Sequence, residues 1–154
     1  MPRDDPQTPA GCKVLVVEDH PQSLELLSIY VESLEGVEVL SAKDGMTAVA
    51  LAEAHRPDLV LLDVMMPRMS GFEVCRRLKE HPATRDIVVV IVTALDTPAD
   101  VERAAECGAD EFLTKPVERR ALLDRVRNLL IVQRQKRQHG RDADRDRSDM
   151  GTQS

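Results

Sequence analysis

The 154-residue sequence predicts an α/β domain, in which a doubly wound, five-stranded parallel sheet carries helices on both faces. Short runs of aliphatic and β-branched residues alternate with segments whose apolar residues recur at helical spacing. The strand runs at 14–17, 59–62 and 87–92 are continuously apolar, as in parallel strands that are buried on both faces. Five such strands, alternating with five helices over short connections, indicate a parallel sheet covered on both sides.

The first two strand–helix units lie within about residues 14–54. Val14–Val17 is a strand run, and a helix of roughly helical apolar spacing follows, with Pro21 suited to its first turn and Gly36 to its end. Val37–Leu40 is the second predicted strand, and Met46–Ala54 is a helix of small apolar residues.

In the third strand–helix unit, a carboxylate directly follows the strand. Asp58–Leu62 is the predicted strand, and it stops at Asp63. Ser70 then caps a helix over Gly71–Lys79, with Glu73 at the third position as a capping-box partner.

The last two units complete the sheet. Ile87–Val92 is the most apolar strand, and Thr97 opens a helix that ends near Gly108. Glu111–Thr114 is a short strand, and a long helix with an apolar face follows Pro116. We therefore expect a disordered tail over residues 1–11, one domain over 12–132, and a helix extension over 133–154 that becomes a disordered charged tail from about residue 139.

Composition excludes several classes of function. The net charge is −6, and because residues 133–154 hold six Arg or Lys against four Asp, a net of +2, residues 1–132 carry −8. With an acidic domain and only three aromatic residues, neither phosphate tracking nor base stacking is expected, so we predict no DNA binding.

The apolar runs and the cysteines of the sequence indicate the cellular compartment of the protein. The longest apolar run has six residues, far short of a membrane span, and the start of the chain lacks an apolar signal core. Three cysteines without C-x-x-C spacing are typical of buried or idle cytosolic thiols. We therefore predict a cytoplasmic protein that does not insert into membranes.

Chemistry-bearing residues follow four of the five predicted strands. Glu18 and Asp19 follow the first strand, Asp63 the third, Thr93 the fourth and Lys115 the fifth. In open α/β sheets, ligands bind outside the carboxyl ends of the strands where the strand order reverses. For the order 2-1-3-4-5 that point lies between strands one and three, so these side chains should converge.

Three carboxylates in one pocket require a cation, because each like-charged pair at about 5 Å costs roughly 3 kcal/mol at an effective dielectric near 20. An all-oxygen set of ligands selects a hard ion such as Mg²⁺. With a Lys ammonium and a Thr hydroxyl at the same rim, Asp63 is the natural covalent acceptor of a phosphoryl group.

Four separated segments carry a resemblance to a known family. VLVVED (14–19), LLDVMMPRMSG (61–71), VTAL (92–95) and GADEFLTKP (108–116) resemble the receiver domain of bacterial two-component response regulators. The resemblance covers about residues 12–132. It implies a flavodoxin-like fold, Mg²⁺ dependence, and phosphoryl transfer from the histidine of a histidine kinase or histidine phosphotransferase.

The resemblance also assigns the site residues. Asp63 matches the phosphoacceptor, Asp19 a direct metal ligand, Glu18 an acid that acts through metal-bound water, and Met65 a residue whose backbone carbonyl binds the metal. Lys115 matches the lysine that contacts the phosphoryl group.

Three further positions match the family's switch. Thr93 matches the switch hydroxyl, Phe112 the switch aromatic, and Pro116 the position of a cis peptide bond. Glu18 stands where Asp is common, and Phe112 where Tyr is common. The first departure should alter metal affinity, and the second removes a hydroxyl but keeps the packing role.

The resemblance implies a signalling protein rather than an enzyme, with self-phosphorylation that depends on Mg²⁺. Met65 and Leu95, two residues beyond Asp63 and Thr93, are apolar where an attacking water would pass, so we expect slow self-dephosphorylation.

We expect a single-domain regulator that acts on an unknown downstream protein. A phosphorylation-dependent homodimer is left open, with Arg125 expected to pair with Asp110 on the dimerising face. The alternatives are a receiver fragment of a longer regulator, or an interaction scaffold that does not depend on phosphorylation.

Two other classes were weighed. A haloacid-dehalogenase-like phosphatase carries an acid two residues after its nucleophile, where this chain has Met65, and its nucleophile follows the first strand. A dinucleotide-binding domain needs a glycine-rich loop after the first strand, where this chain is acidic. Both are disfavoured.

Overall fold

The computed structural model describes residues 8–151, with side chains described up to residue 137. Five strands form one parallel sheet in the order β2-β1-β3-β4-β5, as predicted. The strands span Cys12–Val17, Val37–Ala42, Leu59–Leu62, Val88–Thr93 and Glu111–Thr114. The helices α1 to α5 span Pro21–Glu32, Gly45–His55, Gly71–Glu80, Pro98–Glu106 and Arg119–Gly151.

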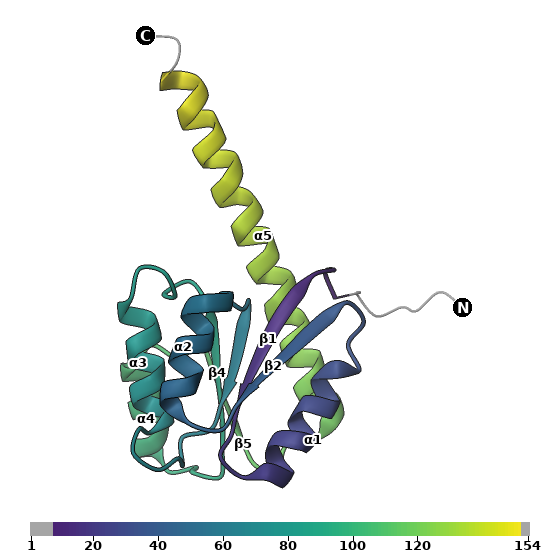
Figure 1. Cartoon of the computed structure of the whole chain (residues 1–154), viewed down its shortest axis with the longest axis vertical. Helices are drawn as coiled ribbons and strands as arrows, with labels where there is room; N and C mark the ends of the chain where they lie inside the picture. The colour runs from purple at the N-terminus through teal and green to yellow at the C-terminus, as the bar shows by residue number, and fades with distance from the viewer. Residues whose placement is uncertain (1–7, 152–154) are drawn as a thin grey trace, which may run out of the picture.

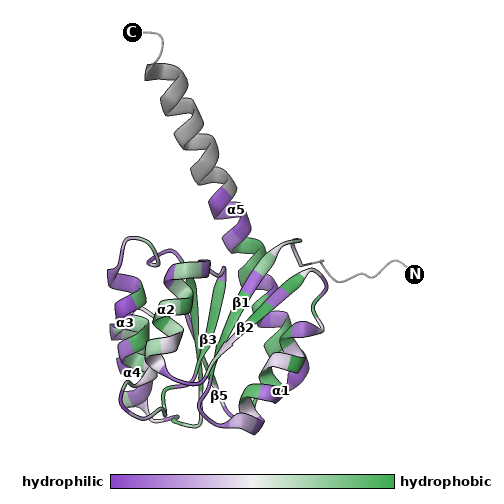
Figure 2. Cartoon of the chain, viewed as in Figure 1, coloured by the Kyte–Doolittle hydropathy of each residue, from purple (hydrophilic) through white to green (hydrophobic). Residues whose placement is uncertain are grey.

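The helices cover both faces of the sheet (Figure 1). One apolar core joins the sheet to α2, α3 and α4, and the other joins it to α1 and α5. The central strands are mostly apolar (Figure 2), apart from Lys13 in β1 and Thr93 at the end of β4, because both of their faces are buried. The doubly wound fold predicted from the sequence is therefore confirmed.

Local signals place the helix starts. Ser70 caps α3 by accepting a hydrogen bond from the Glu73 amide at 3.3 Å. Thr97 and Asp100 form a reciprocal capping box at the start of α4. The three cysteines are free and buried, as the spacing indicated.

The ends of the chain differ from the expected disorder. Residues 1–7 of the expected N-terminal tail lie outside the described part of the chain. At the end of the tail, the Gly11 amide donates to the Gly36 carbonyl at 3.1 Å and forms a turn against the domain. Helix α5 continues to Gly151, through the segment from residue 139 for which we expected disorder. Its sequence there contains no proline, which would have interrupted the backbone hydrogen bonds of the helix.

Among the described residues, none of the helices combines the length and the apolar character that a membrane crossing requires.

Candidate phosphoacceptor and metal site

Polar residues gather at the edge of the sheet where the strands end. Glu18 and Asp19 follow β1, Asp63 follows β3, Thr93 is the last residue of β4, and Lys115 follows β5. Strands β1 and β3 are neighbours in space but not in sequence, so the acidic residues lie where the strand order reverses.

Backbone hydrogen bonds extend the sheet pairing into the site. The Asp63 amide donates to the Val17 carbonyl at 3.0 Å, and the Lys115 amide donates to the Thr93 carbonyl at 2.8 Å. The Lys115–Pro116 peptide is cis, as the resemblance implied. The sheet itself therefore fixes the positions from which the side chains start.

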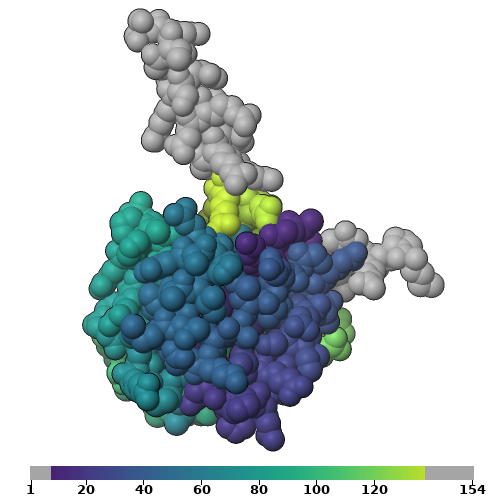
Figure 3. Space-filling model, in the orientation of Figure 1, coloured from purple at the N-terminus to yellow at the C-terminus, as the bar shows by residue number. Residues whose placement is uncertain are grey.

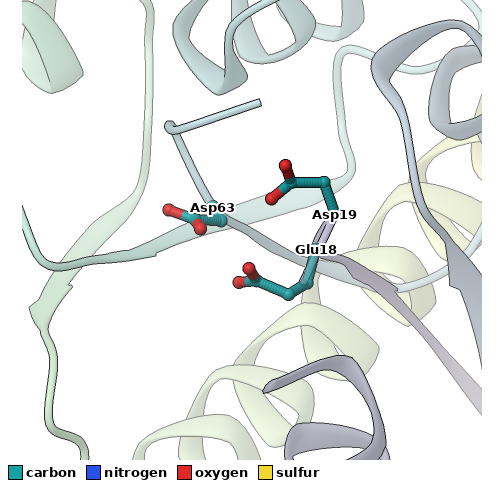
Figure 4. Close-up of side chains that lie close together, drawn as sticks. All are labelled: Glu18, Asp19 and Asp63. Atoms are coloured by element: carbon teal, nitrogen blue, oxygen red, sulfur yellow. The ribbon is translucent and has the colours of Figure 1, made fainter. Parts of the chain in front are cut away.

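The three carboxylates converge. One oxygen from each of Glu18, Asp19 and Asp63 lies within 4.8 Å of the other two, and Figure 4 shows the side chains clustered beside the ends of their strands. Glu18 is 1% exposed and Asp63 is 6% exposed, so solvent screens their charges poorly. The convergence predicted from the strand ends is present.

Lys115 is the cation that the structure places against these acids. Its Nζ lies 2.7 Å from Glu18 Oε2 and 3.4 Å from Asp63 Oδ2. Burial raises the pKa of Glu18, the hydrogen bond from Lys115 opposes that rise, and Asp63 adds to it. Burial acts to lower the pKa of Lys115, but the bond to Glu18 and the charge of Asp63 outweigh it and raise the pKa.

The donor set fits a divalent cation. One ammonium offsets one of three negative charges, which leaves two uncompensated in a largely buried pocket. All three candidate ligands are oxygens, the type that Mg²⁺ prefers, and Mg²⁺ keeps several waters when only one or two carboxylates bind it. The residues present therefore suit Mg²⁺ better than a softer metal.

The remaining predicted residues lie around this cluster. The Thr93 side chain is fully buried, and in the described part of the chain its hydroxyl accepts from the Leu95 amide at 3.4 Å rather than contacting the carboxylates. The Met65 amide donates to Asp63 Oδ1 at 3.3 Å while its side chain is exposed. Phe112 is half-buried against the core that α2, α3 and α4 share with the sheet.

Gly71 is a site-positioning residue that we did not predict. Its amide donates to the Val64 carbonyl at 3.0 Å, and a Cβ on it would meet Val64 Cα at 2.8 Å and the Asp63 carbonyl. Only glycine lets the first turn of α3 approach the backbone of the acceptor this closely. The available signal was a glycine directly after the Ser70 cap.

The pair of Arg125 with Asp110 expected on the dimerising face stays a prediction, because the structure describes one copy of the chain; within that copy both residues have other partners. Arg125 Nη1 instead lies 3.2 Å from Glu111 Oε2, and Asp110 Oδ2 accepts from Lys79 Nζ at 2.8 Å. The alternation of β5 places Glu111, not Asp110, toward α5.

A family model for the response regulator receiver domain matches residues 14–127. The chain belongs to this family. It is therefore a signalling protein with a receiver domain of two-component systems. Receiver domains bind Mg²⁺ at an acidic site, and this chain contains an acidic cluster of Glu18, Asp19 and Asp63.

Curated relatives and solved structures agree. The chain is 48% identical to response regulator PleD of Caulobacter vibrioides over 119 residues, which is 77% of this chain and 26% of PleD. It is 37% identical to protein PilH of Pseudomonas aeruginosa over 77% of this chain and 97% of PilH. A signal receiver domain of a histidine kinase from Syntrophus aciditrophicus superposes with a TM-score of 0.72 at 41% identity, covering 77% of this chain and 89% of that domain.

The relatives differ in how much of their length is matched. The chain spans about a quarter of PleD and about half of the transcriptional regulator RpaA of Synechocystis, but nearly all of PilH.

Proposed function

We propose that this receiver accepts a phosphoryl group on Asp63 from the phosphohistidine of a histidine kinase or histidine phosphotransferase, and that the modification switches a protein-binding face. The observation that carries the proposal is the Asp63 carboxylate itself. It stands at the carboxyl edge of the sheet beside Lys115, with the Thr93 hydroxyl on the neighbouring strand.

The chemistry needs one carboxylate as nucleophile. An Asp63 oxygen attacks the phosphorus, and the bond from phosphorus to the histidine nitrogen breaks with its electron pair on that nitrogen. When the other ring nitrogen carries a proton, the products are an aspartyl-phosphate and a neutral imidazole. Lys115, 3.4 Å from Asp63, can hold a transferred phosphoryl oxygen through a charge-assisted hydrogen bond. The amide of Met65 orients the carboxylate through Oδ1.

Mg²⁺ would be held by Asp19 and Asp63 directly, by Glu18 through water, and by the Met65 carbonyl. When bound, Mg²⁺ supplies positive charge that lets the phosphate approach the acidic cluster. The buried carboxylates of Glu18 and Asp63 support this assignment, because their charges are the least screened by solvent.

The switch uses the two residues that lie apart from the cluster. A phosphoryl oxygen on Asp63 would accept a hydrogen bond from the Thr93 hydroxyl and draw it away from the Leu95 amide, whose bond to the hydroxyl oxygen is long at 3.4 Å. Movement of Thr93 frees space at the start of the β4–α4 connection, and half-buried Phe112 can turn into it. The remodelled face, made by α4, β5 and α5, would bind a downstream protein.

The same face is the one at which two copies would associate. Size-exclusion chromatography of the phosphorylated protein distinguishes a homodimer from a monomer.

We place the protein in the cytoplasm, a proposal supported by its three free thiols, which are typical of a reducing compartment.

The direct test is intact-mass spectrometry after incubation with Mg²⁺ and acetyl phosphate. We expect one added phosphoryl group in the wild type, and none in Asp63→Asn or when EDTA replaces Mg²⁺. Asp124→Asn is the matched control, because Asp124 lies on exposed α5 and should not alter labelling.

No adduct on the wild type, even with a histidine phosphotransferase present, would favour the phosphorylation-independent scaffold. In that case Asp63→Asn would leave partner binding unchanged.

A further inference from the structure

A pocket lined by basic side chains lies at the amino-terminal edge of the sheet, at the end of the domain opposite to Asp63. It forms where α2 and α3 end and where α5 leaves the domain (Figures 1 and 3). Two hollows, of about 950 and about 340 Å³, adjoin there and share Arg56 and Arg137. We refer to the two together as the basic pocket.

The charge of the basic pocket is opposite to that of the protein. Seven Lys or Arg residues and three Asp residues line it, an excess of +4 in a chain of net charge −6. The basic residues are Lys13, Arg56, Lys79, Arg85, Arg134, Lys136 and Arg137.

Two of the acids are already neutralised by ion pairs. Asp58 is buried and lies 2.6 Å from Arg137 Nη1, and Asp110 lies 2.8 Å from Lys79 Nζ. Within the described residues, the side chains of Arg56, Arg85 and Lys136 are exposed and have no ion-pair partner. These three cations therefore outnumber Asp86, the one acid of the basic pocket that is left outside these ion pairs.

Arg56 is held in an unfavourable conformation. It follows α2 with φ 46° and ψ 63°, in the left-handed region, where glycine or asparagine is the usual residue. Its side chain is exposed, so packing does not explain an arginine at this position. Arg56 lines both hollows, so its charge lies where they adjoin.

The partial negative charges at the ends of α2 and α3 balance only part of the positive charge of the basic pocket. The carboxyl ends of α2 and α3 each carry about half a negative charge, which favours nearby cations such as Lys79. Two such ends amount to about one negative charge, well below the excess of +4. In addition, Lys136 and Arg137 come from within α5 and not from a helix end.

We propose that the basic pocket binds a small molecule that carries two or more phosphate groups. Its volume lies in the range of ligand sites, and guanidinium groups match phosphate oxygens in pairs. The lining contains no aromatic side chain on which a base would stack, so the phosphates are the recognised group. This inference does not depend on phosphorylation of Asp63.

The test is isothermal titration of the full chain with tripolyphosphate at low salt. EDTA is present throughout, and Asp63→Asn is titrated in parallel, so that Mg²⁺-dependent binding at the acidic site is excluded. We expect saturable 1:1 binding to both proteins, weakening as salt increases. Parallel titrations with pyrophosphate and ADP identify the source: tighter binding of ADP indicates a nucleotide, and equal binding indicates an inorganic polyphosphate.

Variants separate the basic pocket from general charge. Arg85→Gln combined with Lys136→Gln should weaken binding by about tenfold or more, because each removes a charge-assisted hydrogen bond. Arg56→Asn should also weaken binding by about tenfold, while its thermal midpoint stays equal or rises, because asparagine tolerates the left-handed region. Arg120→Gln, at the exposed start of α5, removes the same charge elsewhere and should leave binding unchanged.

Three results would overturn the proposal: no saturable binding to the wild type, an equal loss in Arg120→Gln, or unaltered binding in both pocket variants. Binding of an Asp- and Glu-rich peptide in place of all the phosphate compounds would assign the basic pocket to an acidic polypeptide instead.

Discussion

Replacing Asp63 by Asn should stabilise the metal-free protein, because it removes more repulsion than attraction. The carboxylate oxygens lie within 4.8 Å of one another, so at an effective dielectric of 20 each like-charged pair costs about 3.5 kcal/mol. Asp63 takes part in two such pairs, for about 7 kcal/mol of repulsion. The attraction between Asp63 and Lys115 Nζ, at 3.4 Å, stabilises the wild type by about 5 kcal/mol and is lost in the variant. The net gain is about 2 kcal/mol, before the lower cost of burying an amide is added.

The assay is thermal unfolding followed by circular dichroism, in EDTA and in Mg²⁺. For a domain of this size, a gain of about 2 kcal/mol raises the midpoint by roughly 6 °C. Mg²⁺ should raise the midpoint of the wild type by mass action, and this increase should be largely lost in Asp63→Asn, because one ligand is missing. Asp124→Asn, which alters an exposed carboxylate on α5, should match the wild type in both buffers.

The reasoning is refuted if Asp63→Asn and the wild type unfold at the same temperature in EDTA and Mg²⁺ shifts neither. The acidic side chains would then be screened or separated in solution, and the site would carry no excess charge.

Three further predictions concern the switch, the phosphoryl lifetime and the packing of the site. Phe112→Ala should leave labelling of Asp63 intact but abolish the gain in downstream-partner affinity on phosphorylation; unchanged partner binding in a pull-down would remove the aromatic from the mechanism. Met65 and Leu95 border the path of an attacking water and are apolar, so the aspartyl-phosphate should decay slowly; a half-life of seconds, followed by mass spectrometry, would contradict this. Gly71→Ala should destabilise the protein by about 2 kcal/mol in urea unfolding, because its Cβ would meet the backbone of Val64; an unchanged midpoint would show that α3 shifts freely.

The fold was predictable because its signals are local. Apolar runs such as Ile87–Val92 indicate strands buried on both faces, and caps such as Ser70 and Thr97 mark helix starts within a few residues. The position of the site was predictable for a related reason. In a parallel sheet all strands end at one edge, so residues that directly follow the strands must meet there.

The pairings within the site were not predictable in the same way. Lys115 bonds Glu18 across 97 positions of sequence, and Arg137 bonds Asp58 across 79. No periodicity encodes such a partner, because the choice depends on which side chains the closed sheet and α5 bring within reach. Within the chain, Arg125 pairs with Glu111 and Asp110 pairs with Lys79 for the same reason.

The sequence by itself determined the alternation of strands and helices, the order of the sheet and the edge that carries Asp63. Only the tertiary structure decided that Gly71 must lack a side chain, that α5 continues past the domain, and that scattered basic residues form one pocket at the opposite edge. The physical reason is that periodicity and capping act over a few residues. The close contact of one backbone with another, and the gathering of like charges in one pocket, arise between segments that only folding brings together.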